Sequence, residues 1–326
     1  MTKKRFLATK IFILTLVCTN AYAQGDVVKQ INDYGNFDRW SVREIKESPI
    51  IGGQTKYLYE FYGNPTDTVR IGKSPFVAPK NYFWRTNNVL AVAAGVVKTN
   101  NTIFPERRGD GYCARIETHI EKIKAMGIIN MEVVCQGIMM VGKIHEPIRD
   151  TKNPQEKVQY GFEYAGRPQG VQFDYKADVG HQIIRGTGFS KLKETGVPDC
   201  AEVVVLLQKR WEDEDGNIHA LRVGTGIERF TRSVSEWQNG HFLKISYGDI
   251  TGKSYYRDYM GLITKPDKIF YATNSKGKRV KVIEEGWASA DEQPNWMVMN
   301  FLSSAGDAFY GGVGNILWID NVKIVE

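Results

Sequence analysis

Residues 306–326 read GDAFYGGVGNILWIDNVKIVE, and this closing stretch decides the fold. A glycine-rich turn leads into ILWIDNVKIV, a mostly apolar run that we expect to be a β-strand and that carries an aspartate in its middle. On simple alternation Asp320 shares its face with Trp318, Val322 and Ile324, so we expect its carboxylate to point inward. A buried carboxylate is costly unless it finds a hydrogen-bonding partner or a cation. The strand therefore predicts a sheet that is covered on one face, with a specific partner for Asp320.

The rest of the chain has the same period of two. Short runs rich in Val, Ile, Tyr and Phe are separated by Gly, Asn, Asp and Pro, and few segments sustain a helical period. The candidate strands are residues 56–63, 112–120, 131–144, 171–178, 201–211, 218–230, 243–248 and 295–304. The fold class that we predict is all-β, a jelly-roll β-sandwich with long decorating loops. Since no repeat or long linker divides the chain, we expect one domain over residues 36–326 and a short leader at 24–35.

The first 23 residues predict a secretory signal peptide. Basic residues precede the apolar run IFILTLV, and AYAQ supplies a cleavage site between Ala23 and Gln24. The apolar run is shorter than the roughly 20 residues that a membrane-spanning helix needs. We therefore expect a secreted protein of the periplasm or cell surface, with no membrane span in the mature chain. A lipoprotein attached through Cys18 is the less favoured alternative, because Val17 stands where a lipobox has a small residue.

Charge and cysteine content exclude two classes of protein. The formal net charge is +6, and the signal peptide carries four basic and no acidic residues, which leaves +2. This balance predicts no nucleic-acid partner. Only Cys113, Cys135 and Cys200 follow the signal peptide, too few for a scaffold built on disulfides. Cys113 and Cys135 lie in neighbouring predicted strands, and the sequence leaves open whether they are paired or free.

Several motifs together resemble a known family. NFDRW (36–40) and the closing strand bracket the chain as the first and last strands bracket carbohydrate-binding-module-like jelly rolls. With YCARIETH, VQFDYKAD and KRWEDEDGNIHALRVGTGIERF, they resemble the family named "putative carbohydrate metabolism domain" of secreted Bacteroidetes proteins. The resemblance covers nearly the whole mature chain. It implies a galactose-binding-like jelly roll and a function connected with carbohydrate, whereas a fold by itself fixes no activity.

The resemblance also implies a possible cofactor. In related jelly rolls an aspartate of the last strand holds a structural calcium ion together with groups of the first strand. Here the implied ligands are Asp320 and Asp38, and oxygen ligands suit calcium. The alternative is that Asp320 accepts hydrogen bonds from turn amides or pairs with an arginine. No other cofactor is required by the sequence.

Alternating strands supply the candidate ligand-binding residues. One face of each of two strands is polar, and aromatic rings offer flat surfaces on which sugar rings stack. The candidates are Arg115, Glu117, His119, Gln172, Asp174 and Lys176, with Trp84 and Trp211 as the aromatic residues. Outer strand faces of a sandwich also meet water without any ligand, which is the simpler interpretation.

Three functions follow from these residues. We favour a secreted, non-catalytic protein that binds an oligo- or polysaccharide. The first alternative is a glycoside hydrolase or lyase, whose carboxylate pair would come from Glu60, Glu117 and Asp174. The second is a structural or assembly protein of the cell envelope that binds another protein through an edge strand. The tripeptide DTV at Asp67–Val69 also resembles the O-glycosylation signal of Bacteroidetes, with Thr68 as acceptor.

Overall fold

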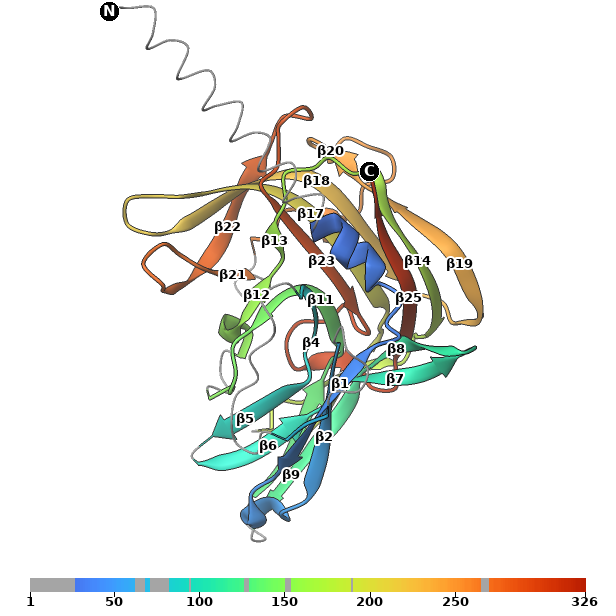
Figure 1. Cartoon of the computed structure of the whole chain (residues 1–326), viewed down its shortest axis with the longest axis vertical. Coiled ribbons are helices and arrows are strands. Elements are labelled where there is room, and N and C mark those ends of the chain that lie inside the picture. Colours follow the sequence, from blue (N-terminus) through green and yellow to red (C-terminus); the bar gives the residue numbers. More distant parts are fainter. Residues whose placement is uncertain are drawn as a thin grey trace, which may run out of the picture.

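The computed structural model describes residues 27–61, 68–70, 82–93, 95–125, 129–149, 154–188, 190–264 and 270–326. The described chain is nearly all β, as the sequence predicts. Two sheets packed face to face make the body of the protein, and a smaller group of hairpins lies at one end (Figure 1).

The smaller of the two body sheets contains the strand that closes the sequence. Its five strands, in spatial order, are β19 (Val234–Lys244), β14 (Gly170–Asp178), β25 (Ile316–Val325), β8 (Gly111–Glu117) and β7 (Ile103–Arg108). The closing strand β25 is the central one, paired antiparallel with β14 on one side and β8 on the other.

The larger sheet has ten strands, and strands near its two ends pair with each other. In spatial order they are β13 (Phe162–Glu163), β23 (Trp296–Leu302), β17 (Ala201–Glu212), β18 (Ile218–Phe230), β22 (Arg279–Trp287), β21 (Phe270–Thr273), β12 (Val158–Tyr160), β11 (Ile138–Ile144) and β4 (Trp84–Thr86), with β20 (Ser246–Tyr247) on β18. Because β11 pairs with β12 and also with β23, seven of these strands close a hydrogen-bonded circuit. The sheet therefore curls around one of its faces.

The main core lies between the two sheets. Alternate residues of β23 show the arrangement: Met297, Met299 and Phe301 pack in this core, whereas Val298 belongs to a second apolar cluster on the inner side of the curl. From the smaller sheet, Leu317 of β25 and its neighbours face the same main core. Alternation along one strand thus fills two separate interiors.

The remaining elements surround the body. Short sheets are formed by β1 (Trp40–Lys46), β2 (Thr55–Phe61) and β3 (Thr68–Arg70), by β5 (Val89–Ala93) and β6 (Val96–Asn100), by β9 (His119–Ala125) and β10 (Ile129–Cys135), and by β15 (Gln182–Arg185), β16 (Lys193–Pro198) and β24 (Tyr310–Gly312). Three 3₁₀ turns span Pro49–Ile51, Pro154–Lys157 and Asp258–Met260. Residues 27–33 form a helix.

The two ends of the described chain are neighbours. The helix at 27–33 lies beside β25 (Figure 1), and Ile31 within it is buried in the main core. The amide of Val322 donates to the carbonyl of Gly35 at 2.8 Å, and the Asn32 side chain binds both backbone groups of Ile324. Residues 27–35 of the predicted leader are therefore part of the folded body.

Two predicted strands are each divided in the structure. Residues 112–120 are split at Thr118 into β8 and β9, and residues 131–144 are split at Gln136 and Gly137 into β10 and β11. At Thr118 the chain leaves the five-stranded sheet for the β9–β10 hairpin, and at Gln136 and Gly137 it leaves that hairpin for the larger sheet. An apolar run that continues from one sheet into another carries no local sign of the change, so periodicity alone joined them.

Candidate functional site

The outer face of the five-stranded sheet gathers the predicted residues Lys176 and Arg115. Lys176 of β14 lies opposite Trp318 of β25, and Trp318 lies opposite Arg115 of β8. Arg115 in turn lies opposite Phe104 of β7. Strands far apart in the sequence therefore place two aromatic and two cationic side chains in one cross-strand row.

Trp237 of β19 extends this row to the fifth strand. The Lys176 Nζ lies 4.3 Å from the ring centre of Trp318 and 5.8 Å from that of Trp237. The Arg115 guanidinium lies 5.4 Å from the ring centre of Phe104. Such contacts are worth about 0.5–1 kcal/mol each at exposed sites. We call this row of alternating rings and cations, Trp237, Lys176, Trp318, Arg115 and Phe104, the aromatic ladder.

Glu106 borders the ladder and ties it together. It accepts a hydrogen bond from the Trp318 indole at 2.8 Å and lies 3.5 Å from Arg115 and 3.7 Å from Lys176. The side chains of Lys176, Arg115 and Glu106 are 24%, 28% and 37% exposed. Each polar group thus has a partner that orients it and also keeps access to solvent.

A bulge reverses the expected direction of Asp320. The next residue, Asn321, has a left-handed backbone with φ of 50°, and the pairing of β14 with β25 shifts register here. Val322 and Ile324 therefore turn into the core, whereas Asp320 stays on the outer face. The prediction that Asp320 points inward with these two residues was wrong, because strict alternation ends at a bulge.

Arg108 occupies the place predicted for calcium. Its Nη1 lies 2.5 Å from Asp320 Oδ2 and 2.8 Å from Asp174 Oδ2. Burial raises the pKa of Asp320 to about 6, although Arg108 lowers it. Asp38 lines the same surface depression, but its carboxylate accepts the backbone N–H of Tyr112 at 2.9 Å. The Arg108 guanidinium is bound directly by Asp320 and Asp174 where a calcium ion would have to lie, so these residues do not fit a calcium ion. Within the described ranges, no group of three or more His, Cys, Asp or Glu side chains suits a metal ion.

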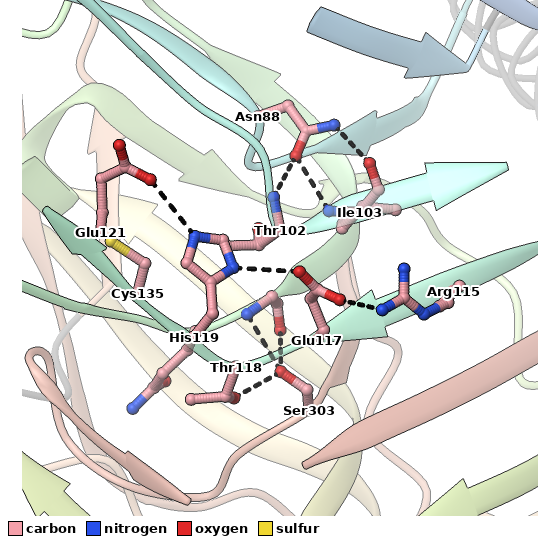
Figure 2. A network of polar contacts seen from close by, with 12 residues as sticks. Asn88, Thr102, Ile103, Arg115, Glu117, Thr118, His119, Glu121, Cys135 and Ser303 are labelled. Atoms are coloured by element: carbon pink, nitrogen blue, oxygen red, sulfur yellow. Dashed lines mark hydrogen bonds and ion pairs between the residues drawn. The ribbon is translucent and has the colours of Figure 1, made fainter. Parts of the chain in front are cut away.

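A chain of charged groups leads away from the ladder (Figure 2). Glu117 pairs with Arg115, and the other oxygen of Glu117 lies 3.1 Å from His119 Nδ1. His119 Nε2 lies 3.6 Å from Glu121, whose carboxylate is 2.6 Å from Lys98 Nζ. Burial lowers the pKa of His119, but the contacts with Glu117 and Glu121 outweigh it and raise the pKa to about 9. The predicted Glu117 and His119 are therefore members of a continuous ion-pair network.

Hydrogen bonds between uncharged groups hold the backbone near Thr118, where the chain passes from β8 to β9. The hydroxyl groups of Thr118 and Ser303 lie 2.8 Å apart (Figure 2). Beside them the Asn88 Oδ1 accepts the backbone N–H groups of Thr102 and Ile103 at 2.8 and 3.0 Å. Satisfied buried groups of this kind hold a backbone in one position, because breaking them leaves orphan donors.

Two predicted residues are buried elsewhere. Trp84 is 1% exposed in the main core, so its ring offers no face to a sugar. Glu60 is 3% exposed and belongs to β2, in a different sheet from Glu117 and Asp174. The predictions of Trp84 as a binding platform and of a catalytic set with Glu60 were wrong, since alternation does not tell which face of a strand a neighbouring element covers.

Trp211 and Gln172 remain exposed, but Trp211 is separate from the ladder. Trp211 is 42% exposed on β17 of the larger sheet and stacks on His219, with ring centres 5.4 Å apart. His219 is held between Asp213 at 3.0 Å and Glu285 at 2.6 Å. Gln172 is exposed on β14. Trp211 is thus a second, isolated ring platform.

Sequence reasoning missed most of the ladder. Trp318 lies in the quoted closing strand, and its position next to Asp320 on one face was the available signal. Phe104 is followed by Pro105, which a central strand does not tolerate and which β7 accepts as an edge strand. Trp237 lies in the mostly polar run VSEWQNGHFLK, which lacks the apolar alternation of a predicted strand.

Other predictions concern residues that the structure describes only in part. Ala23 and Gln24 lie outside the described residues, and Thr68 begins β3 with a side chain that is not described. Cys113 and Cys135 are both free thiols, which settles the alternative that the sequence left open. In the described part of the chain no helix has the length and apolar character to cross a membrane.

Comparisons with known proteins add structural neighbours only. No family profile and no curated sequence matches the chain. A structure described as a putative glycoside hydrolase of Bacteroides thetaiotaomicron is 16% identical with a TM-score of 0.44, covering 87% of this chain and 70% of that one. A second structure, described as a putative glycoside hydrolase from Bacteroides vulgatus, is 15% identical with a TM-score of 0.45, and the match covers 89% of this chain and 96% of that one. Similarity at this level does not bear on the activity of the chain.

Proposed function

We propose that this chain is a secreted, non-catalytic carbohydrate-binding protein and that the aromatic ladder is its binding surface. The observation that carries the proposal is the unbroken alternation of ring and cation across all five strands. A sugar ring has an apolar C–H face and a rim of hydroxyls. Aromatic faces accept the first, and charged donors and acceptors bind the second strongly.

The local geometry supports a preformed surface. Trp237 is held by the Arg108 guanidinium, 3.8 Å from its ring centre, and Trp318 by its hydrogen bond to Glu106. Side chains that are already fixed lose little conformational entropy when a ligand binds. Sugar hydroxyls gain from such fixed partners, because each hydrogen bond must compete with water.

The charged groups favour binding over hydrolysis. A hydrolase needs two carboxylates across a cleft, one acting as an acid and the other as a base or nucleophile. Glu117 is engaged by Arg115 and His119, while Asp174 accepts hydrogen bonds from Gly240 and Asn321 in addition to its pair with Arg108. These carboxylates serve neighbouring groups of the protein. The predicted signal peptide supports an activity in the periplasm or at the cell surface.

A glycan array followed by calorimetric titration of any bound oligosaccharide tests the proposal. We expect saturable binding without release of reducing sugar. Trp318→Ala should weaken binding about tenfold or more, since loss of a well-placed ring costs about 1.4 kcal/mol or more. Trp318→Phe should restore part of the affinity, because it keeps a ring.

Trp211→Ala is the matched control, because it removes an exposed ring from the other sheet. Equal losses in the Trp211 and Trp318 variants would place binding outside the ladder. A blank array with folded protein would reject carbohydrate binding. Release of reducing sugar that disappears in Asp174→Asn would instead support a hydrolase.

A further inference from the structure

A large cavity lies on the opposite side of the larger sheet from the main core, away from the aromatic ladder. It has a volume of about 430 Å³ and extends from the inside of the curl that β11, β12 and β23 close to the β5–β6 and β9–β10 hairpins. Its floor is formed by alternate residues of three neighbouring strands, Val204 and Leu206 of β17, Ile227 of β18 and Leu302 of β23. Sheets that close on themselves can enclose space for one small ligand.

Further apolar side chains form the walls. Tyr160 of β12 and Phe270 of β21 line the cavity, with ring centres 4.9 Å apart. Ile138 and Ile144 of β11 line it from the strand that completes the circuit. Ligand pockets commonly measure about 300–1,000 Å³ and have mostly apolar walls with a few placed polar groups. The size and lining of this cavity are of that kind.

One of the polar groups is unusual. Asn300 is 3% exposed, lies two residues before Leu302 on β23 and lines the cavity. Its Oδ1 is buried and has no hydrogen-bond partner among the described residues. Asn100 of β6 also lines the cavity, and its buried Oδ1 likewise has no hydrogen-bond partner among the described residues. A buried acceptor without a partner costs about 1–3 kcal/mol, and nothing in the apolar packing requires an amide here.

Four of the five charged residues in the lining are paired with one another, and the fifth is Asp307. Arg229 is 2.7 Å from Glu202, and Lys98 is 2.6 Å from Glu121. A ligand with a net charge would have to lose its hydration in an apolar interior without a free counter-charge from these pairs. The lining therefore favours an uncharged molecule.

We propose that this cavity binds a small, uncharged, mostly apolar molecule that carries a hydroxyl or N–H group, which hydrogen-bonds to the amide of Asn300. The amide offers a donor and an acceptor, and rotation of its terminal bond exchanges their positions. The ligand class is that of fatty alcohols and neutral aromatic amines. This site is independent of the carbohydrate proposal, since the ladder lies on the other sheet.

Titration of the full mature chain with N-phenyl-1-naphthylamine tests the proposal. This uncharged compound has two aromatic groups and one N–H, and its fluorescence rises in apolar surroundings. We expect saturable binding of one molecule per chain. Leu206→Trp, which fills the floor, should weaken binding at least about tenfold, whereas Ile283→Trp, at an exposed site on β22, should leave it unchanged. Circular dichroism verifies that both variants fold, and Val204→Phe replaces Leu206→Trp if that variant does not.

Competition experiments then examine Asn300. In the wild type, 1-decanol should displace the fluorophore about 5- to 10-fold better than decyl methyl ether, which lacks the O–H donor. In Asn300→Leu this preference should vanish while the fluorophore still binds. Absence of saturable binding, or binding that Leu206→Trp and Val204→Phe leave unchanged, would overturn the proposed site. An alcohol preference that persists in Asn300→Leu would overturn the role of the amide.

Discussion

Glu60 should make the stability of this protein depend on pH in an unusual direction. Its carboxyl group is 3% exposed on β2, with Oε1 bound to the Thr86 hydroxyl and a buried Oε2 without a partner among the described residues. Burial raises the pKa of Glu60 from 4.5 to about 7, even though Arg43 and Arg85 lower it. Near neutral pH the folded state therefore holds a proton that the unfolded state has released.

The sign and size of the effect follow from this difference. Between pH 4.5 and about 7 the folded state binds more protons than the unfolded state, so the free energy of unfolding falls as pH rises. The contribution of Glu60 is complete below 4.5 and is lost as pH rises through about 7. At about 1.4 kcal/mol per pKa unit, the total is about 3 kcal/mol. Glu60→Gln removes this titration. As pH rises through about 7, the free energy of unfolding of the variant should therefore increase relative to that of the wild type by about that amount.

Urea denaturation of both proteins at several pH values between about 5 and 8 measures this change. The exposed Glu163→Gln on β13 serves as the matched control. Taking the difference between variant and wild type cancels the titration of all other groups. A difference that stays constant with pH would refute the coupling between Glu60 ionisation and folding.

Three further predictions concern packing and ions. Arg222→Met should cost about 3–5 kcal/mol in denaturant unfolding, because Arg222 and Glu284 are 0% and 1% exposed and removal of one partner leaves a buried charge; adding Glu284→Leu should recover part of the loss. Gly35→Ala should lower the melting temperature, because the added Cβ would lie 2.0 Å from the Val322 carbonyl oxygen and should cost about 1–3 kcal/mol of stability. An unchanged melting temperature would contradict the packing of residue 35 against β25. Chelation with EDTA should leave the melting temperature unchanged, because Arg108 neutralises Asp320; a decrease would restore the calcium hypothesis.

Local patterns predicted much of the β architecture. The hairpin of β17 and β18 matches the predicted runs at 201–211 and 218–230, and the closing strand matches 316–325. These strands lie in sheets with a buried face, so the hydrophobic pattern is strong along them. Strands β1, β5, β6, β15 and β16 of the small sheets were not predicted, and neither were β7, β21 and β22 of the body sheets.

Of the candidate site, only the charged residues Arg115 and Lys176 could be predicted from the sequence. Arg115 and Lys176 could be assigned to outer faces by alternation within their own strands. Their common row with Trp318 depends on the pairing of β14, β25 and β8, which are separated by long stretches of sequence. The bulge at Asn321 changed the direction of later residues, and no single residue type announces a bulge.

The sequence by itself determined the β class and the period of each strong strand, because these follow from backbone geometry within a few residues; the side on which Asp320 lies did not follow from alternation, because of the bulge at Asn321. Tertiary structure alone decided which strands became neighbours, where the larger sheet curls, and which buried face enclosed Trp84 or left a cavity beside Asn300. Those outcomes depend on packing between distant segments, and the free energy of such packing is not contained in any one stretch of the chain.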